Sequence, residues 1–411
     1  MMLARLAWRN LYRNKRRSLL TVAAVSFATF LTVVFRGIAV GTWEYSLQNT
    51  VTLFSGFLQV QRHGYQDAPS LNKSFQYPEK VVSALESCPG VTGYAPRIMA
   101  DGLITYGANS SGAAILGIDP LAERKVSRFH ERVRDGRMLQ PDSPDEIVVG
   151  YKLLENLKAK VGDFLVVLAQ GYDGVMGNNR YRVVGTLKMG VPEFDAMTVV
   201  MNLGAVQQLL AMDGRVNVVA VGSLDFSGLS GVQKQLARAL AQRGLTNVEV
   251  LTWDEVMPEL KQAMEVDLVN DSVLLVILIV IVTFGILNTV LMSITERYRE
   301  FGITLAMGMQ PAVLVRLVLF ETALIAVLGI LSGGLLGHIA NWHFTAHPIT
   351  LGGQLAQFYE DYGFLPQIVS TTRVSIPLTV MGGILVVSLI AGVYPAFRVS
   401  RLEPLKGIRY T

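Results

Sequence analysis

The chain has 411 residues, of which 51% are hydrophobic and 17% are charged, and its formal net charge is +4. This charge content is low for a soluble protein and favours a membrane protein that carries a soluble insert. Basic residues do not form a patch with interleaved aromatic residues, so we do not interpret the positive charge as nucleic-acid binding.

Residues 1–17 contain six basic residues and no acidic one. Arg5, Arg9 and Arg13 recur every four positions beside an apolar stripe, a pattern that predicts an amphipathic helix on the cytoplasmic face of a membrane. The alternative is a plain basic tail that only orients the first membrane span.

Four segments are apolar over about the 20 residues that a membrane span needs. They are residues 18–43, 271–295, 313–337 and 376–394. The first is longer than the apolar core of a secretory signal peptide and no clear cleavage site follows it, so we expect an uncleaved anchor. The sequence therefore predicts an α-helical membrane protein with four transmembrane helices.

Lys and Arg residues predict how these spans are oriented. They gather in residues 1–17, in the loop 296–312 and in the tail 395–411, whereas the loop 338–375 holds one. By the positive-inside rule, both termini and the loop 296–312 lie in the cytoplasm, and residues 44–270 and 338–375 lie outside. The expected location is the inner (cytoplasmic) membrane, and nothing in the sequence of the loop 338–375 indicates its role.

Residues 44–270 alternate strand-like and helix-like patterns. This alternation predicts a large extracytoplasmic α+β domain of two lobes between the first and second spans. Strand-pairing signals concentrate at about residues 135–205, where we expect an inserted β-rich lobe. The single cysteine, Cys88, lies in this region, so no internal disulfide forms and the domain depends on its hydrophobic core.

One loop of this domain has an apolar tip. Residues 164–169 and 181–187 look like paired strands, and the loop between them holds three glycines. Val175 and Met176 form its apolar tip, which is a candidate for contact with a partner.

The third span carries an ionisable residue and a stripe of small residues. Glu321 lies at membrane depth, where an ionisable residue usually faces protein or water, and we expect a membrane ion pair with Arg316 or a bond to a partner helix. Overlapping Gly-x-x-x-Gly motifs let helices approach closely, either within this chain or against a second copy. Their glycines are Gly329, Gly333 and Gly337.

The sequence contains neither a nucleotide-binding loop nor a hydrolase motif. It has no Gly-x-x-x-x-Gly-Lys-Ser/Thr loop for ATP and no Gly-x-Ser-x-Gly element of a hydrolase. His343 and His347 are four residues apart, but Pro348 follows and no carboxylate accompanies them, so we expect interfacial histidines rather than metal ligands. We predict a non-catalytic subunit without catalytic residues, metal or bound cofactor, in which any ATP and Mg²⁺ belong to a separate ATPase.

The segment 296–309, between the second and third spans, combines charge with apolar character. Its charged residues are Glu296, Arg297, Arg299 and Glu300. The apolar residues that follow are unsuited to a solvated loop; they are Phe301, Ile303, Leu305 and Met307. We predict a short helix that lies against a protein surface or the membrane face.

Three motifs resemble those of FtsX-like permeases, the membrane subunits of MacB-type and LolC/LolE-type ABC transporters. The first runs from Asn288-Thr289-Val290 through Glu296-Arg297-Tyr298-Arg299-Glu300-Phe301-Gly302 to Ala306-Met307-Gly308. The others are Tyr394-Pro395-Ala396 with Arg401-Leu402-Glu403-Pro404-Leu405, and Trp8-Arg9-Asn10-Leu11 with Arg16-Arg17. The outer region matches loosely, through Asp135-Gly136-Arg137, Glu146–Gly150 and Val161-Gly162-Asp163.

This resemblance implies a dimer of such subunits, identical or paralogous, with two cytoplasmic ABC ATPase chains. The charged helix would be the coupling helix, and the resemblance assigns ATPase docking to Glu296, Arg297, Arg299, Glu300, Phe301 and Gly302. ATP-driven closure would move the outer domains by mechanotransmission. In LolC/LolE-like members this movement extracts lipoproteins from the inner membrane for a periplasmic carrier, which the loop 170–180 could contact.

Two other functions remain open within the family. One is an FtsX-type signalling subunit that activates a periplasmic hydrolase. The other is an export or efflux subunit for peptides or small molecules, working with a periplasmic adaptor.

Overall fold

The structure is a computed structural model that describes residues 9, 12, 15–77, 79–224, 226, 228–361 and 366–400. Most of the predicted surface helix over residues 1–17, and the tail from residue 401, lie outside these residues. The chain forms two compact units. One comprises Met1–Glu44, Met264–Thr350 and Gln367–Thr411; the other comprises Tyr45–Ala263 and Leu351–Pro366.

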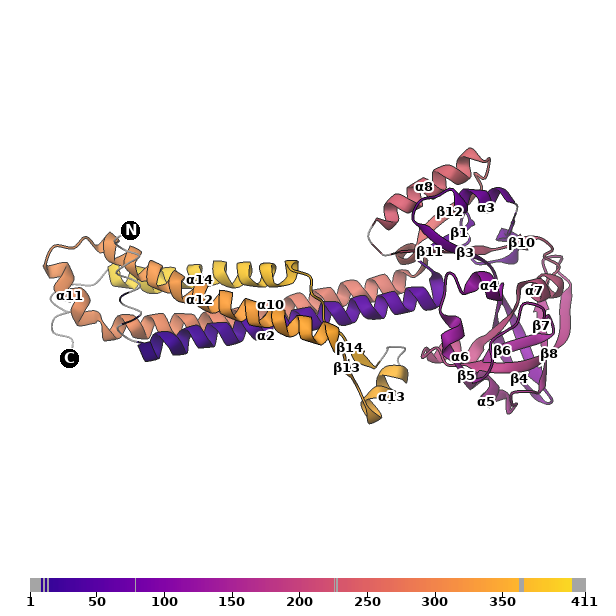
Figure 1. Cartoon of the computed structure of the whole chain (residues 1–411), viewed down its shortest axis with the longest axis horizontal. Helices are drawn as coiled ribbons and strands as arrows, with labels where there is room; N and C mark the ends of the chain where they lie inside the picture. The colour runs from indigo at the N-terminus through magenta and orange to yellow at the C-terminus, as the bar shows by residue number, and fades with distance from the viewer. Residues whose placement is uncertain are drawn as a thin grey trace. The chain divides into compact units, whose positions relative to one another are not determined.

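Four long helices build the first unit (Figure 1): α2 (Lys15–Thr50), α10 (Pro258–Glu296), α12 (Pro311–Ala346) and α14 (Ser375–Ser400). Among the described residues, these are the four helices long and apolar enough to cross a membrane. They are longer than the predicted spans because helix continues beyond each apolar stretch. The 39 residues of α10 extend to about 58 Å at ~1.5 Å per residue, against ~30 Å of bilayer hydrocarbon.

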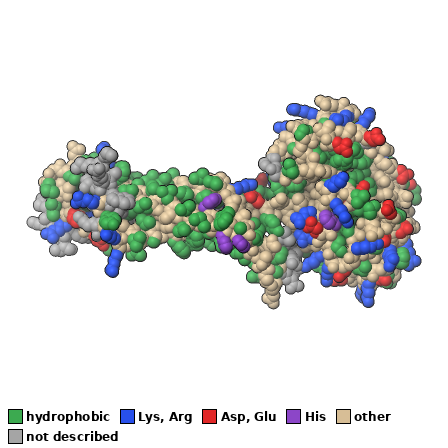
Figure 2. Space-filling model, viewed as in Figure 1, with side chains coloured by type: hydrophobic (Ala, Val, Ile, Leu, Met, Phe, Trp, Pro, Cys, Tyr) green, Lys and Arg blue, Asp and Glu red, His purple; other side chains and the backbone are tan. Residues whose placement is uncertain are grey.

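The surface of these helices is apolar (Figure 2). On α10, for example, Leu274, Ile281 and Phe284 are each at least 60% exposed. Inside the unit, buried side chains from several helices form one cluster that includes Val25, Leu314 and Ile384. An apolar exterior of this kind suits contact with lipid or with another membrane helix.

A ten-stranded sheet forms the centre of the second unit, in the order β12-β1-β11-β3-β4-β9-β6-β8-β5, and β7 pairs with β3 and β8. The strands are β1 (Leu58–Arg62), β3 (Val91–Tyr106), β4 (Asn109–Ile118), β5 (Val133–Gly136), β6 (Glu146–Gly150), β7 (Phe164–Gln170), β8 (Met176–Leu187), β9 (Thr198–Asn202), β11 (Val218–Ser223) and β12 (Val248–Thr252). Two strand pairs lie apart from it, β2 (Phe75–Gln76) with β10 (Arg215–Val216) and β13 (Ile349–Thr350) with β14 (Gln367–Ile368).

Shorter helices accompany the sheet and the connections. They are α3 (Glu79–Glu86), α4 (Pro120–Glu123), α5 (Tyr151–Leu157), α6 (Pro192–Met197), α7 (Leu203–Leu209), α8 (Leu229–Gln242), α9 (Trp253–Val256), α11 (Tyr298–Ala306) and α13 (Gly353–Asp361). A π-helical turn covers Val51–Ser55, and 3-10 turns cover Leu71–Lys73 and Phe129–Arg132.

One end of the sheet follows a split βαβ pattern. In chain order its elements are β1, α3, β3, β11, α8 and β12, and neighbouring strands are antiparallel. The strands β4 to β9 are inserted between β3 and β11, so the insertion begins at Asn109, earlier than the predicted boundary near residue 135. The long strand β3 joins both parts, because Val91–Arg97 pair with β11 and Arg97–Tyr106 pair with β4.

Candidate functional site

The connection between α10 and α12 forms the helix α11, which ends at a glycine. Gly308 adopts a φ of +95°, a conformation that glycine tolerates best. The Gly308 N–H donates to the Leu305 carbonyl at 3.0 Å and the Met309 N–H donates to the Thr304 carbonyl at 3.2 Å. This is the Schellman pattern, and it stops the helix before Pro311 begins α12.

One face of α11 is buried in the helical unit. Phe301 is 7% exposed and belongs to the apolar cluster of the helices, and Gly302 beside it is also buried. At the start of the helix, Arg297 is 5% exposed. Its Nη1 lies 3.1 and 3.2 Å from the two carboxylate oxygens of Glu321 on α12. An apolar anchor and an ion pair therefore fix this face to the neighbouring helices.

The opposite face of α11 is exposed. Glu296, Arg299 and Glu300 are exposed, Ile303 is 42% exposed and Met307 is 76% exposed. Arg299, Ile303 and Met307 follow one another at intervals of four, so they lie on one side of the helix. We call Arg299, Glu300 and Ile303 of α11, together with Glu296 at the end of α10 and Met307 directly after α11, the outer stripe of α11. It combines charges of both signs with apolar side chains, which suits a protein surface better than bulk water.

This arrangement separates the six predicted docking residues into two groups. Glu296, Arg299 and Glu300 are exposed on the outer stripe, whereas Arg297, Phe301 and Gly302 face the helical unit. The second group is therefore placed to hold α11, and it is too buried to touch a partner in this arrangement.

Glu321 has a different ion-pair partner from the predicted Arg316. Its carboxylate bonds to Arg297, while Arg316 is exposed. Residues five apart on a helix point in directions roughly 140° apart, so Arg316 and Glu321 of α12 face different sides. Glu321 is thus paired inside the protein, and its partner comes from the start of the neighbouring helix α11.

The three glycines of α12 pack against α2 of the same chain. A Cβ built on Gly329 would lie 2.6 Å from the Val25 Cβ, and a Cβ built on Gly337 would lie 2.8 Å from the Val33 Cβ. A Cβ on Gly333 would lie 2.8 Å from the Thr29 Cβ. The sequence left open whether these glycines pack within the chain or against a second copy, and the structure shows packing within the chain.

We expect Gly333→Val to disrupt this contact, since its side chain would meet the α2 backbone at Ser26 as well as Thr29. Overpacking of this kind costs about 1–3 kcal/mol. The check is the melting temperature of the purified chain in detergent, with Gly382→Ala on α14 as a control because no atom lies within 4 Å of a Cβ there. Equal melting temperatures for the two variants would contradict the close approach of α2 and α12.

Two further ion pairs of the helical unit were not predicted: one joins α2 to α10, and the other joins α2 to the segment before α14. The Arg36 Nη1 on α2 lies 3.0 Å from an Asp271 carboxylate oxygen on α10. Arg373 lies 2.6 Å from Glu44 of α2. Arg36 follows one apolar run and Asp271 directly precedes another, so opposite charges at the ends of two predicted spans were the sequence pattern that could have indicated the first pair.

The predicted partner-contacting tip is the β7–β8 turn. Val175 is 65% exposed and Met176 is 58% exposed. The turn itself is anchored, because the Tyr172 N–H donates to the Leu210 carbonyl at 2.7 Å and the Arg215 guanidinium lies 4.7 Å from the Tyr172 ring centre. The turn thus presents two exposed apolar side chains on a fixed base.

His343, in the last turn of α12, and His347, the residue directly after the helix, stack on each other with 4.9 Å between their ring centres. Within the part of the chain that the structure describes, no group of three or more His, Cys, Asp or Glu side chains could hold a metal ion.

Comparison with known proteins gives two family matches. The MacB-like periplasmic core domain matches residues 18–243, which is more than half of the chain, and the FtsX-like permease C-terminal family matches residues 272–404. In relation to the structure, the first match covers α2 and most of the sheet. The second covers α11, α12 and α14 and most of α10.

Curated relatives match over nearly the whole chain. The lipoprotein-releasing system transmembrane protein LolC of Xylella fastidiosa (strain 9a5c) is 26% identical over 97% of this chain and 96% of its own length. LolC of Neisseria meningitidis serogroup B is 24% identical over 93% of this chain and 95% of its own length. The macrolide export ATP-binding/permease protein MacB of Acinetobacter baylyi is 21% identical over 96% of this chain and 57% of its own length.

These matches agree with the three motifs and with the four apolar helices. Relatives of this kind are membrane-embedded permease subunits of ABC transporters. The chain therefore belongs to the FtsX-like, MacB-type family of ABC transporter permeases.

Proposed function

We propose that this chain is a non-catalytic permease subunit that couples ATP hydrolysis by a separate cytoplasmic ATPase to movement of its α/β unit, and that it extracts lipoproteins from the inner membrane. The observation that carries the coupling role is the outer stripe of α11. It is an exposed, mixed charged and apolar surface on a short helix between two membrane-length helices, α10 and α12.

The contacts of α11 support a role in transmitting force. A helix that receives a push from a partner must be held firmly by the helices it moves. Phe301 packs into the apolar cluster and Arg297 bonds to Glu321 of α12, so a displacement of α11 acts directly on α10 and α12. Interiors packed this closely are stiff and transmit such displacements.

The substrate class rests on the relatives. The two LolC proteins are named for lipoprotein release and match this chain end to end, whereas MacB is named for macrolide export. In the proposed function the anchored β7–β8 turn, with Val175 and Met176 exposed, contacts a periplasmic carrier that receives the lipoprotein. Both termini and α11 are on the cytoplasmic side, and a second permease subunit completes the complex.

Reconstitution tests this proposal. The chain, its cognate ATPase and any partner permease are placed in proteoliposomes that contain a fluorescent lipoprotein, and the released lipoprotein is measured after ATP and carrier are added. We expect release that requires ATP and that falls severalfold with Val175→Asp/Met176→Asp, because charge at the tip opposes an apolar contact. ATP hydrolysis without release, together with transport of a macrolide, would assign the chain to export instead.

A further inference from the structure

A cleft of about 700 Å³ lies in the α/β unit. Its floor is formed by Gln59 of β1, Met99 and Asp101 of β3, and residues of β4 and β9. Its walls are the loop from Tyr65 to Asn72 and the β7–β8 turn. This volume is in the range of pockets that hold drug-sized molecules.

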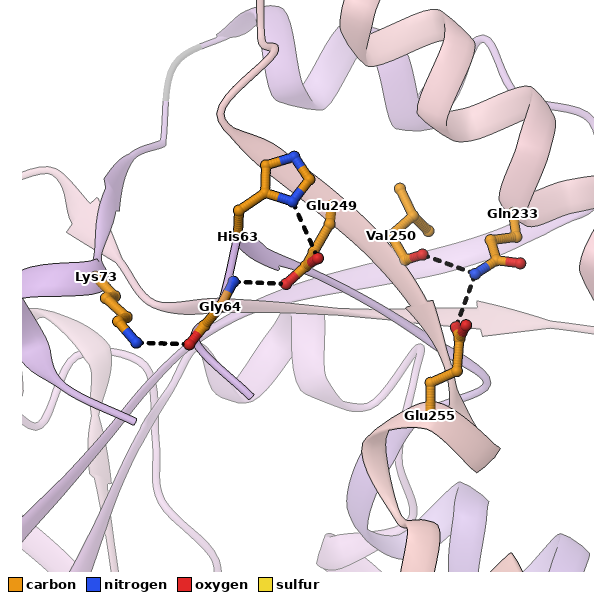
Figure 3. Close-up of polar contacts among 7 residues, drawn as sticks. All are labelled: His63, Gly64, Lys73, Gln233, Glu249, Val250 and Glu255. Carbon is orange, nitrogen blue, oxygen red and sulfur yellow. Dashed lines mark hydrogen bonds and ion pairs between the residues drawn. The ribbon is translucent and has the colours of Figure 1, made fainter. Parts of the chain in front are cut away.

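The first wall is fixed by polar contacts at its base (Figure 3). The Glu249 carboxylate accepts a hydrogen bond from the Gly64 N–H at 3.1 Å and lies 3.0 Å from the His63 Nδ1. Lys73 donates to the Gly64 carbonyl at 2.6 Å. Further along the wall, the Gln66 amide donates to the Val256 carbonyl at 2.8 Å.

Val256, which also lines the cleft, ends α9, and α9 is itself held in place. Gln233 of α8 donates to the Val250 carbonyl at 2.9 Å and to the Glu255 carboxylate at 2.8 Å (Figure 3). The second wall is anchored through Tyr172, as described for the β7–β8 turn. Because both walls are bonded to the body of the unit, the cleft is pre-formed and a ligand need not order it.

The lining is apolar and aromatic with a few polar groups. Its apolar and aromatic members include Tyr65, Met99, Leu116, Tyr172 and Phe194. Thr198, also in the lining, is 2% exposed, and its hydroxyl has no hydrogen-bond partner. A buried hydroxyl without a partner costs free energy, so it lowers the stability of the lining rather than offering a ligand an open contact.

Charge decides which ligand suits the cleft. Asp101, which is exposed, is the one charged side chain among the described lining residues. Burial, and to a lesser degree the Asp101 charge, raises the pKa of Tyr65 to about 12, so the Tyr65 phenol remains neutral at physiological pH. Arg215 already lies 4.7 Å from the Tyr172 ring centre, so the aromatic rings left beside the negative charge of Asp101 are those of Tyr65 and Phe194. A negative charge beside aromatic rings is a combination that attracts cations.

The floor also disfavours a peptide added as an extra strand. β3 pairs with β11 and β4, β4 pairs with β3 and β9, and β9 pairs with β4 and β6. Addition of a strand requires a free sheet edge. On the edge away from β4, β3 pairs with β11 up to Arg97 and with β7 from Leu103. Between them the Asn217 side chain bonds the Met99 N–H and carbonyl, so only a short stretch around Asp101 is open. Recognition in the cleft must therefore go through side chains.

We infer that this cleft is a binding site for a small amphipathic molecule that carries one positive charge, with its apolar body between Met99 and the aromatic side chains and its cationic group at Asp101. This site is separate from the outer stripe of α11, and the inference does not rest on the proposed function.

The test uses the full chain in nanodiscs of zwitterionic lipid and three probes that share one ring system. Naphthylmethylamine is cationic, naphthylmethanol is neutral and naphthalenesulfonate is anionic, and calorimetric titration against empty nanodiscs removes the contribution of lipid. We expect the amine to bind most tightly. Asp101→Asn should weaken the amine about fivefold to tenfold and leave the alcohol unchanged, because it removes a charge-assisted contact.

Two more variants and one control complete the test. Met99→Trp should narrow the cleft beside Asp101 and weaken binding of the amine severalfold, whereas Asp142→Asn, which changes an exposed carboxylate outside the lining, should change nothing. Thr198→Val should raise the melting temperature by roughly a few degrees, since it removes the unpartnered hydroxyl. Equal affinity for the amine and the sulfonate, or amine binding that neither Asp101→Asn nor Met99→Trp weakens, would overturn the inference.

Discussion

Replacing Glu321 with alanine is expected to lower the stability of the helical unit by about 3–5 kcal/mol, because it leaves the Arg297 charge buried without its carboxylate partner. The Arg297 side chain is 6% exposed and the Glu321 side chain is 15% exposed, so water does not replace the lost contact. The melting temperature of the purified chain measures this loss. The activity of the partner ATPase in the assembled complex should also fall, because α11 loses one of its two attachments to the neighbouring helices.

A double variant distinguishes a lost contact from general damage. Arg297→Met/Glu321→Leu replaces the ion pair with an apolar pair of similar size, an exchange that is often neutral or stabilising. It should recover most of the stability that Glu321→Ala loses. The control is Arg316→Ala, since Arg316 is exposed on the same helix. Equal melting temperatures for Glu321→Ala and Arg316→Ala would show that the pair contributes nothing.

Alanine at Glu296, Arg299 and Glu300 together is expected to weaken ATPase binding by about fivefold to a hundredfold, while the chain remains folded. Removal of charges from a docking surface costs roughly 1–3 kcal/mol in total through lost attraction and specificity, and each 1.4 kcal/mol is tenfold in affinity. All three side chains are exposed, so the change leaves the buried face of α11 intact. Co-purification of the ATPase with the detergent-solubilised chain measures the effect.

Thr304→Ala is the uncharged control on α11, because Thr304 borders the outer stripe, is half-buried and bonds through its hydroxyl to the Glu300 carbonyl of its own helix, so its removal leaves the charges of the stripe in place. The ATPase should co-purify with this variant as it does with the unchanged chain. If the triple alanine variant co-purified with as much ATPase as the unchanged chain does, the outer stripe would not be part of the docking interface.

The sequence predicted the membrane helices and several strands well because their patterns are strong. Long apolar runs identify α2, α10, α12 and α14, and the alternation before and after the β7–β8 turn identifies its two strands. The sequence did not predict the strand β3, because Gly93, Pro96 and Gly102 interrupt the alternation of apolar and polar residues that is typical of a strand. Gly102 has a structural reason: a Cβ there would lie 2.6 Å from the Leu168 carbonyl oxygen of β7, so only glycine lets β7 pair beside it.

The charged segment 296–309 could be located from sequence, but its two faces could not. The helix breaks between α10 and α11, so counting along the sequence does not show which side chains turn inward. Arg297 lies at that break and faces Glu321, a contact 24 residues away that no local pattern encodes. The ion pairs of Arg36 and Arg373 depend in the same way on how segments far apart in the sequence meet.

The central claim, that the outer stripe of α11 docks on the ATPase, can be tested by site-directed cross-linking in membranes. Cys88, the single cysteine of the sequence, is 6% exposed, so little cross-linker should attach to it. Cysteine introduced in turn at Arg299, Ile303 and Met307, and at the buried Phe301, is treated with a short photoreactive cross-linker beside the ATPase. We predict ATPase adducts from the three outer positions and none from position 301; adducts from position 301 alone, or from no position, would contradict the account.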